Sequence, residues 1–523
     1  MTNELRDDLV GYDFQGDVPL PSSIGPIIPK GNQTQEFLPF RCTTGRKTTE
    51  NKRWMIALRA IGSVAAPVSM GLAILAVVSI IELIWISKLG GRAMAGVGAV
   101  LALRGLIEVL LAICPTGGTS LVGRAIGERQ FKSTTGVATS AIAANLCIGL
   151  ILSLCFYAGL SPAMSWMGLD AGTREFAIQY GSLFVFLIPI LATLRSLNAI
   201  YYGLGESALP NIVYSVAIIL GALIEPIAIL GAGKWHGLGV RGAVLVMLIT
   251  HGVTCAFLGH NLWRRGIISM LAFMRSAWTS DLFAILRIGA PIAAADVVVA
   301  MIYPILTAHV SKYGTDALAG LTLAQHLETL PYLLSLGCLT STSTFVAQYF
   351  GRKDFQKIEQ MVRCSWVLLT AVLCFLAGIF LAGPVWISTH FVSGNPVIEY
   401  AALALMYCGV GEVFIGWQVL AEGILSGLGK TRPYFVVSLL TGLGTIALME
   451  IFSKVSCLGI HGVLLAFTGG LSIKGVWLLY EAGRALRQER SAWASPTRSS
   501  LAVDSTEHRM NKIKNQSWVP VSA

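Results

Sequence analysis

Charged residues are scarce in this chain of 523 amino acids. Asp, Glu, Lys and Arg make up 13% of the residues, whereas 54% are hydrophobic, and the mean hydropathy is +0.68. Soluble globular domains carry about a quarter charged residues. The composition therefore excludes a soluble protein and indicates a polytopic membrane protein.

Several sequence motifs of catalysis and energy conversion are missing. The chain has no GxxxxGK[ST] loop for a nucleotide, so we expect no ATP-driven step. It has neither HExxH nor GxSxG, which argues against a familiar intramembrane hydrolase. Its ten cysteines show no CxxC spacing and lie mostly within apolar stretches, so we interpret them as small core residues. We expect no enzyme and no metal site.

Long apolar stretches recur along almost the whole chain. Each is at least about as long as the roughly 20 residues that cross a hydrocarbon core of about 30 Å. Lipid offers the backbone no hydrogen-bond partners, and the stretches lack period-two alternation, so helices are predicted rather than barrel strands. The predicted fold class is all-α, with twelve transmembrane helices over residues 60–87, 94–117, 134–160, 177–197, 209–231, 239–261, 285–310, 318–347, 364–388, 398–424, 433–453 and 459–481.

The two ends of the chain are polar. Residues 1–53 show no apolar core after a basic start, so we expect a disordered tail and no cleavable signal peptide. Residues 488–523 are polar and Ser-rich and are predicted to form a second disordered tail.

The net charge of +10 is explained by where the basic residues lie relative to the predicted spans. Basic residues concentrate before the first span and after spans two, six, eight and ten, and the positive-inside rule places these loops and both termini in the cytoplasm. We therefore expect a multi-pass protein of the plasma (inner) membrane and no nucleic-acid partner.

The chain repeats itself at an offset of 224 residues. Pro67 falls on Pro291, the segment SKLGGRAMAG at 87–96 falls on SKYGTDALAG at 311–320, and YGLGES at 202–207 falls on SGLGKT at 426–431. Near the end of each half the offset becomes 220. The repeat predicts two homologous six-helix lobes, residues 54–270 and 271–487, related by a pseudo-twofold axis along the membrane normal, as in transporters.

These segments together resemble the multidrug and toxic compound extrusion (MATE) family. The resemblance lies in the order of Pro67, Glu82 and SKLGGRAMAG, the loop GRAIGERQF, the turns YGLGE and SGLGKTRP, and IEPIAILG followed by LGVRGAV. It covers roughly residues 57–482 and leaves out both tails. It implies a V-shaped pair of lobes that exports bulky, often cationic, amphipathic compounds in exchange for inward-moving H⁺ or Na⁺.

The resemblance also implies an ion-coupling site. Glu82 and Glu225 fall where one branch of the family carries two aspartates in its N-lobe. Gly221 stands where that branch has an asparagine, which favours H⁺ over Na⁺ because an oxygen ligand is lost. Asn198 and Thr250 remain as polar partners. Bending of the first span at Pro67 is a candidate hinge, with helix packing as the alternative.

Further candidates lie in the second half. Another branch of the family carries acidic residues on spans seven and ten, which makes Asp296, Glu412 and Glu422 secondary candidates for binding the ion or the substrate. Trp417 and Gln418 are candidates for lining a cavity that accepts aromatic cations. A carboxylate inside a span costs about 2.5–3.5 kcal/mol and is usually functional. A protonated glutamate bonded to a neighbouring helix is the structural alternative for Glu225.

Three functions remain open. The first is a secondary active exporter whose partners are a small-molecule substrate and the membrane lipid, acting as a monomer with H⁺ or Na⁺ and no other cofactor. The second is a flippase for a lipid-linked precursor, whose mark is a basic cavity; Arg195 is the main basic residue noted inside a span. The third, a membrane-embedded enzyme, has no candidate catalytic cluster.

Overall fold

The computed structural model describes residues 50–233, 235–269, 280–391, 394–455 and 458–494. The two predicted tails lie outside the described residues except where helices extend into them. The first helix begins at Glu50 and the last ends at Ala494.

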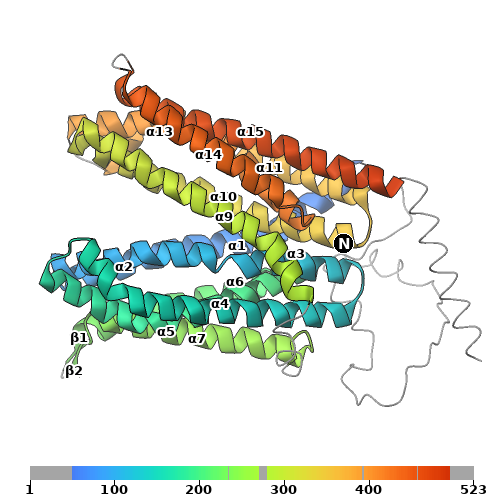
Figure 1. The fold of residues 1–523 in the computed structure, drawn as a ribbon, viewed down its shortest axis with the longest axis horizontal. Helices are drawn as coiled ribbons and strands as arrows, with labels where there is room; N and C mark the ends of the chain where they lie inside the picture. Colours follow the sequence, from blue (N-terminus) through green and yellow to red (C-terminus); the bar gives the residue numbers. More distant parts are fainter. Residues whose placement is uncertain (1–49, 234, 270–279, 392–393, 456–457, 495–523) are drawn as a thin grey trace, which may run out of the picture. The chain divides into compact units, whose positions relative to one another are not determined.

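Nearly all of the described chain is helical (Figure 1). The first half contains α1 (Glu50–Ser87), α2 (Gly91–Leu110), α3 (Ile113–Gly127), α4 (Phe131–Trp166), α5 (Ala171–Leu204), α6 (Ala208–Leu230) and α7 (Val240–Arg264). The second half contains α9 (Ser280–Val310), the short 3₁₀ helix η4 (Ser311–Tyr313), α10 (Thr315–Gly351), α11 (Phe355–Ala382), α12 (Pro384–Phe391), α13 (Asn395–Gly427), α14 (Arg432–Ser453) and α15 (Gly459–Ala494). Between α6 and α7 lies a small antiparallel hairpin of β1 (Gly231–Ala232) and β2 (Trp235–His236).

Among the described residues, twelve segments are long and apolar enough to cross a membrane, with α2 and α3 forming one span from Gly91 to Gly127. Each overlaps one of the twelve predicted spans, so the predicted all-α fold is confirmed. The break inside the second span follows from Pro115, which cannot donate to the carbonyl of Leu111. That carbonyl instead accepts from Asn145 Nδ2 of α4 at 3.2 Å.

Proline in the first span is accommodated in the same way. Pro67 lies inside α1 and leaves the carbonyl of Ser63 without its helical donor. The hydroxyl of Ser207, just before α6, donates to that carbonyl at 3.3 Å and to the adjacent carbonyl of Val64 at 2.9 Å. The second half repeats this arrangement. Pro291 lies inside α9 and leaves the carbonyl of Arg287 without its helical donor, and the hydroxyl of Thr431, just before α14, donates to that carbonyl at 3.5 Å.

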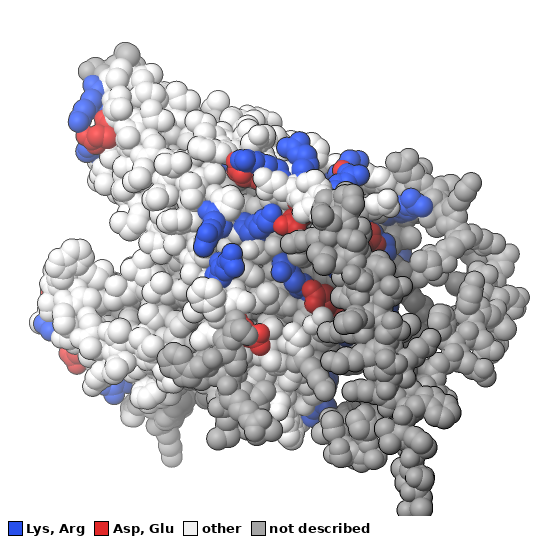
Figure 2. All heavy atoms as spheres, turned by 45° about the vertical axis from the view of Figure 1, so that its right-hand side comes forward, with Lys and Arg blue, Asp and Glu red and all other residues white. Residues whose placement is uncertain are grey.

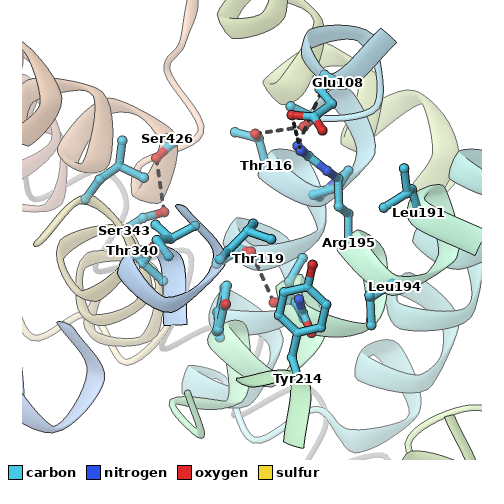
Figure 3. Close-up of a pocket in the computed structure, with 18 of the residues that line it drawn as sticks. Glu108, Thr116, Thr119, Leu191, Leu194, Arg195, Tyr214, Thr340, Ser343 and Ser426 are labelled. Atoms are coloured by element: carbon cyan, nitrogen blue, oxygen red, sulfur yellow. Dashed lines mark hydrogen bonds and ion pairs between the residues drawn. The ribbon is translucent and has the colours of Figure 1, made fainter. Parts of the chain in front are cut away.

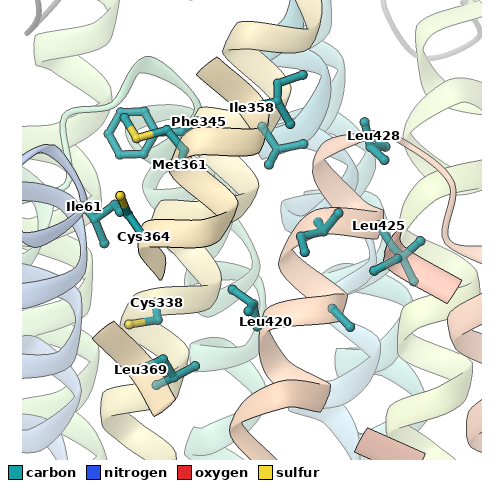
Figure 4. Packing of buried hydrophobic residues seen from close by; sticks show 14 of the residues in the cluster. Ile61, Cys338, Phe345, Ile358, Met361, Cys364, Leu369, Leu420, Leu425 and Leu428 are labelled. Carbon is teal, nitrogen blue, oxygen red and sulfur yellow. The ribbon is translucent and has the colours of Figure 1, made fainter. Parts of the chain in front are cut away.

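Contacts between helices follow the predicted repeat. Helix α1 contacts α6 in its own half and α10 in the other, and the equivalent α9 contacts α14 in its own half and α3 in the other. The first span therefore contributes to both cores: Ile61 of α1 lies in one hydrophobic cluster with Phe345 of α10 and Cys364 of α11 (Figure 4).

The two halves are in close backbone contact where α3 and α10 end. A Cβ added at Gly127 would collide with the backbone carbonyl of Gln348, and one added at Gly351 would collide with that of Arg124. These four residues form two contacts related by the 224-residue offset. We call this pair of contacts the seam.

Side chains reinforce the seam with hydrogen bonds across it. Gln348 Nε2 donates to the carbonyl of Gly203 at 2.9 Å, and Arg124 Nη2 donates to that of Leu428 at 3.0 Å. One turn earlier, Thr344 donates to Tyr202 and Ser120 to Gly427. Side chains of each half thus donate hydrogen bonds to backbone carbonyls at the C-terminal end of a helix in the other half, which is α5 or α13.

Ion pairs at the same end of the helices repeat with their charges exchanged. Glu206 follows α5 and pairs with Arg265 at 2.6 Å, whereas the equivalent Lys430 follows α13 and pairs with Glu489 of α15 at 2.6 Å. Figure 2 shows Lys and Arg side chains gathered over this end, with few charges on the neighbouring apolar flank.

Adding a methyl group at the seam should destabilise the protein. In Gly127→Ala and Gly351→Ala the new Cβ must displace a backbone carbonyl, and such overpacking costs about 1–3 kcal/mol. We expect a lower thermal unfolding midpoint for the purified protein in detergent. Gly98→Ala in α2 is the control, because a Cβ there meets nothing within 4 Å. Equal midpoints for all three variants would contradict the account of the seam.

Candidate functional site

A central cavity of about 570 Å³ lies between the two halves. Its wall is formed by α1, α2, α3, α5 and α6 of the first half and by α10 and α13 of the second. Small-molecule sites usually measure about 300–1,000 Å³. On the side of the second half its wall includes Ser343 and Ser426, and the hydroxyl of Ser426 donates to that of Ser343 at 3.0 Å (Figure 3).

Three charged side chains form a network in the wall of this cavity. Glu108 Oε1 lies 2.7 Å from Nε of Arg104, and Glu108 Oε2 lies 3.1 Å from Nη2 of Arg195 (Figure 3 shows the second pair). Two guanidinium groups therefore share one carboxylate. Arg104 and Glu108 were not among the predicted site residues, although two opposite charges four residues apart within an apolar span indicate a pair on one helix face.

A second, small cavity of about 30 Å³ in the first half brings together both predicted acids. Glu82 is 4% exposed and Glu225 is 3% exposed. Glu82 Oε1 accepts from the hydroxyl of Tyr180 at 3.2 Å, whereas Glu225 Oε2 has no partner among the described residues. On α6 the neighbours Leu223 and Ile224 are exposed, so Glu225 faces the bundle interior and its apolar neighbours face outward.

The structure also gives a reason for Gly221. A Cβ at this position would lie 2.7 Å from Cγ2 of Thr250, so an asparagine would not fit against α7 as packed here. Thr250 lines the small cavity, but its hydroxyl already donates to the carbonyl of Met247 at 3.1 Å. Asn198 is separated from this group, because it lines the central cavity instead.

Leu75, Ser79 and Arg104 line both the small cavity and the central one, and His251 adds a further connection. Arg104 lines both cavities, and its positive charge acts on Glu82 as well as on Glu108. His251 lines the small cavity, and its Nε2 lies 3.0 Å from the hydroxyl of Tyr214, which lines the central cavity. The small cavity and the central cavity are therefore neighbours that share part of their wall.

The second half contains a third cavity of about 610 Å³. It brings together three predicted residues, Asp296, Gln418 and Glu422. Glu422 lines this cavity and the central cavity as well. Glu328 also lines it; the sequence analysis did not select this residue.

Two other predicted residues of α13 lie elsewhere. Glu412 is 1% exposed, and neither of its carboxylate oxygens has a hydrogen-bond partner among the described residues. Trp417 does not line the cavity of the second half; its Nε1 donates to Thr370 of α11 at 3.0 Å, and its ring packs against Trp366 and Phe414.

No group of three or more His, Cys, Asp or Glu side chains within the described ranges has an arrangement that could hold a metal ion.

Comparison with known proteins places these features in a family. The family model MatE matches residues 67–227 and 291–449, two segments that begin 224 residues apart. The chain is 24% identical to the probable multidrug resistance protein NorM of Deinococcus radiodurans, over 84% of this chain and 97% of that protein. It is 20% identical to an FAD transporter of Shewanella oneidensis, over 82% and 94%. A crystal structure of MATE in the bent conformation is similar in fold, with a TM-score of 0.77 at 20% identity over 86% and 100% of the two chains.

Both matched segments together span more than half of the chain, and they fall on the two halves of the repeat. The resemblance seen in the sequence is thereby confirmed, and with it the expectation that the protein is no enzyme. The chain belongs to the MatE family of multidrug and toxic compound extrusion transporters.

Proposed function

We propose that this transporter is a secondary active exporter of amphipathic or cationic small molecules, driven by an inward flow of H⁺. One observation carries the proposal: two buried carboxylates, Glu82 and Glu225, share a small cavity whose neighbour Arg104 also lines the large central cavity. Relatives such as the NorM proteins are named for multidrug resistance, which supports the substrate class.

The surroundings of the two acids favour a proton over Na⁺ as the coupling ion. An alkali cation needs several oxygen ligands, whereas a proton needs only one carboxylate oxygen. Gly221 supplies no side-chain oxygen, and Asn198 lines a different cavity. We propose that the two carboxylates exchange the proton between them, and Glu225 Oε2, which has no partner among the described residues, is one of the oxygens that can hold it.

Arg104 offers a physical route for coupling. An ionised Glu82 attracts the guanidinium of Arg104 and weakens its hold on Glu108, which leaves the Glu108 carboxylate more open to a cationic substrate. A proton on Glu82 removes this attraction and returns Arg104 to Glu108. Proton and cation then oppose each other, as antiport requires.

The seam defines the conformational step. The positive-inside rule assigns the basic end of the helices, and with it the seam and both termini, to the cytoplasm. Access from that side requires the contacts between α3 and α10 to separate. In this proposal proton binding and substrate binding favour opposite states of the seam.

Neutralising both acids should uncouple the transporter. In proteoliposomes with an imposed pH gradient, the Glu82→Gln and Glu225→Gln double variant should lose at least about 90% of the gradient-driven transport of a cationic dye, because no carboxylate remains to carry the proton. Glu175→Gln, at an exposed glutamate of α5, should transport normally. Undiminished transport by the double variant would refute this proposal, and transport driven by a Na⁺ gradient but not by a pH gradient would exclude H⁺ as the coupling ion.

A flippase for an anionic lipid-linked precursor is the second candidate. It is favoured by a specific observation, since the wall of the central cavity carries two arginines, Arg104 and Arg195, for one carboxylate. This excess of positive charge suits a phosphate group.

The two functions differ in what the arginines do. A fluorescent polyprenyl phosphate should not cross liposome membranes faster with the protein than without it if the protein is an exporter of cations. Transbilayer movement that the protein accelerates, and that Arg104→Gln with Arg195→Gln abolishes, would establish the flippase instead. Arg174→Gln, at a half-buried residue outside the central cavity whose Nη2 donates to Ser161 Oγ at 2.6 Å, is the matched control.

A further inference from the structure

A groove of about 280 Å³ lies between α11 and α15, outside the cavities described above. Both helices pack against α13 and leave the groove between them. The groove shares no lining residue with the central cavity, the small cavity or the cavity of the second half. Its apolar walls are formed by Phe355 and Ile358 of α11 and by Leu479, Tyr480, Gly483 and Leu486 of α15.

The floor of the groove is well packed, and its mouth is open. Ile358 is 1% exposed and lies in one hydrophobic cluster with Leu478 and Ala482 of α15. Tyr480, by contrast, is 59% exposed. A Cβ added at Gly483 would meet nothing within 4 Å. The groove therefore has room beside Gly483 for part of another molecule.

An exposed apolar stripe on α15 leads into this groove. Ile473, Val476 and Tyr480 are exposed, and Gly483 follows at the same helical spacing of three or four residues, so all four lie on one face of the helix. This part of α15 is the one that hydropathy predicts to cross the membrane. The stripe therefore faces the lipid acyl chains, and the groove can be entered from the lipid.

Arginines line the other end of the groove. Arg487 and Arg490 follow Gly483 by four and seven residues on α15, and both are exposed. The carboxylate in the lining, Glu359 of α11, lies 2.8 Å from Nη2 of Arg363 and 3.5 Å from Nη1 of Arg490. Three guanidinium groups thus surround one carboxylate, which leaves positive charge where the apolar walls end.

The first half contains the equivalent groove without the arginines. A groove of about 400 Å³ is lined by residues of α4 and α7, and these helices both pack against α5. At the offset of 220, His260 in its lining corresponds to Tyr480, and Trp263 to Gly483. None of the described residues that line it is Lys or Arg. The arginines are therefore a property of the second half and do not follow from the repeated fold.

We propose that the groove between α11 and α15 binds one anionic phospholipid of the cytoplasmic leaflet. The phosphate accepts hydrogen bonds from Arg487 and Arg490, since guanidinium groups match phosphate oxygens in charge and geometry. One acyl chain lies over Gly483 and along Tyr480. Lys430, beside the seam, pairs with Glu489 of α15, so the groove lies at the basic end of the helices, which the positive-inside rule assigns to the cytoplasm.

Charge complementarity argues for an anionic headgroup. The cytoplasmic leaflet carries anionic lipids and a negative surface potential, and each arginine near that surface contributes about 1 kcal/mol of attraction. The site takes no part in the proposed export or in its coupling to protons. A failure of either proposal therefore leaves the other one intact.

Native mass spectrometry of the purified full-length protein in detergent tests the site. Dioleoyl phosphatidylglycerol should be retained as one tightly bound molecule, and dioleoyl phosphatidylcholine should bind at least about tenfold more weakly. Replacing both arginines, in Arg487→Gln with Arg490→Gln, should weaken phosphatidylglycerol at least about tenfold. Gly483→Leu fills the path of the acyl chain and should weaken it about tenfold. The control, Arg129→Gln with Arg264→Gln, removes two exposed arginines at the same end of the first half and should change nothing.

Equal affinity for the two lipids, or unaltered phosphatidylglycerol binding in the variant without Arg487 and Arg490, would overturn the proposal. An equal loss in the control would show general attraction to a basic surface instead of a site. Undiminished binding in Gly483→Leu, or binding of glycerol 3-phosphate as tight as that of the lipid, would overturn the role of the groove. Folding is checked by thermal unfolding, and if Gly483→Leu does not fold, the arginine variants and their control still decide.

Discussion

The hydrocarbon core of a membrane holds no water that could satisfy a polar backbone group, so each such group needs a partner within the protein. This constraint determines how the helices pack here. Pro67 and Pro115 each remove a backbone donor, and each carbonyl left without its helical donor accepts a hydrogen bond from a side chain of another segment. Ser207 donates to the carbonyl of Ser63, and Asn145 donates to that of Leu111. The same demand is met at the seam, where Gln348 reaches a carbonyl at the end of α5. Bonds that satisfy the backbone thereby fix how the spans, and the two halves, contact each other.

The charged side chains of the interior are subject to the same constraint, and the proposed coupling depends on them. In the first half Arg104 pairs with Glu108 at 2.7 Å and its charge also acts on Glu82, and in the second half the charge of Lys474 acts on Asp296 and Glu422. Each cation acts on two carboxylates, so in the proposed mechanism a positive charge arriving at one carboxylate changes the electrostatic surroundings of the other. Buried charge that is shared in this way can respond to a ligand, whereas a tight buried pair is costly to break.

Much of the fold could be predicted from the sequence because lipid permits few alternatives to helices, and because the 224-residue repeat assigned each span to a half. The meeting of Glu82 and Glu225 followed from the family resemblance. The separation of Asn198 from them, and the direction of Trp417 toward α11, depend on helix rotation, which hydropathy does not encode. Arg104 and Lys474 were missed because basic residues were considered mainly as topology signals in loops. Helices also extend past the apolar core, so α1 begins at Glu50 rather than at residue 60.

The central claim is that proton and substrate exclude each other through buried acids. Its most direct test uses quinacrine, a fluorescent aromatic amine. Saturating quinacrine is added to the purified protein in weakly buffered detergent solution, and the released protons are measured with a pH-indicator dye. The account predicts release of about one proton per protein molecule, and no release from the double variant Glu82→Gln with Glu225→Gln, which must still bind the amine. Binding without proton release by the unaltered protein, or equal release from both proteins, would contradict it.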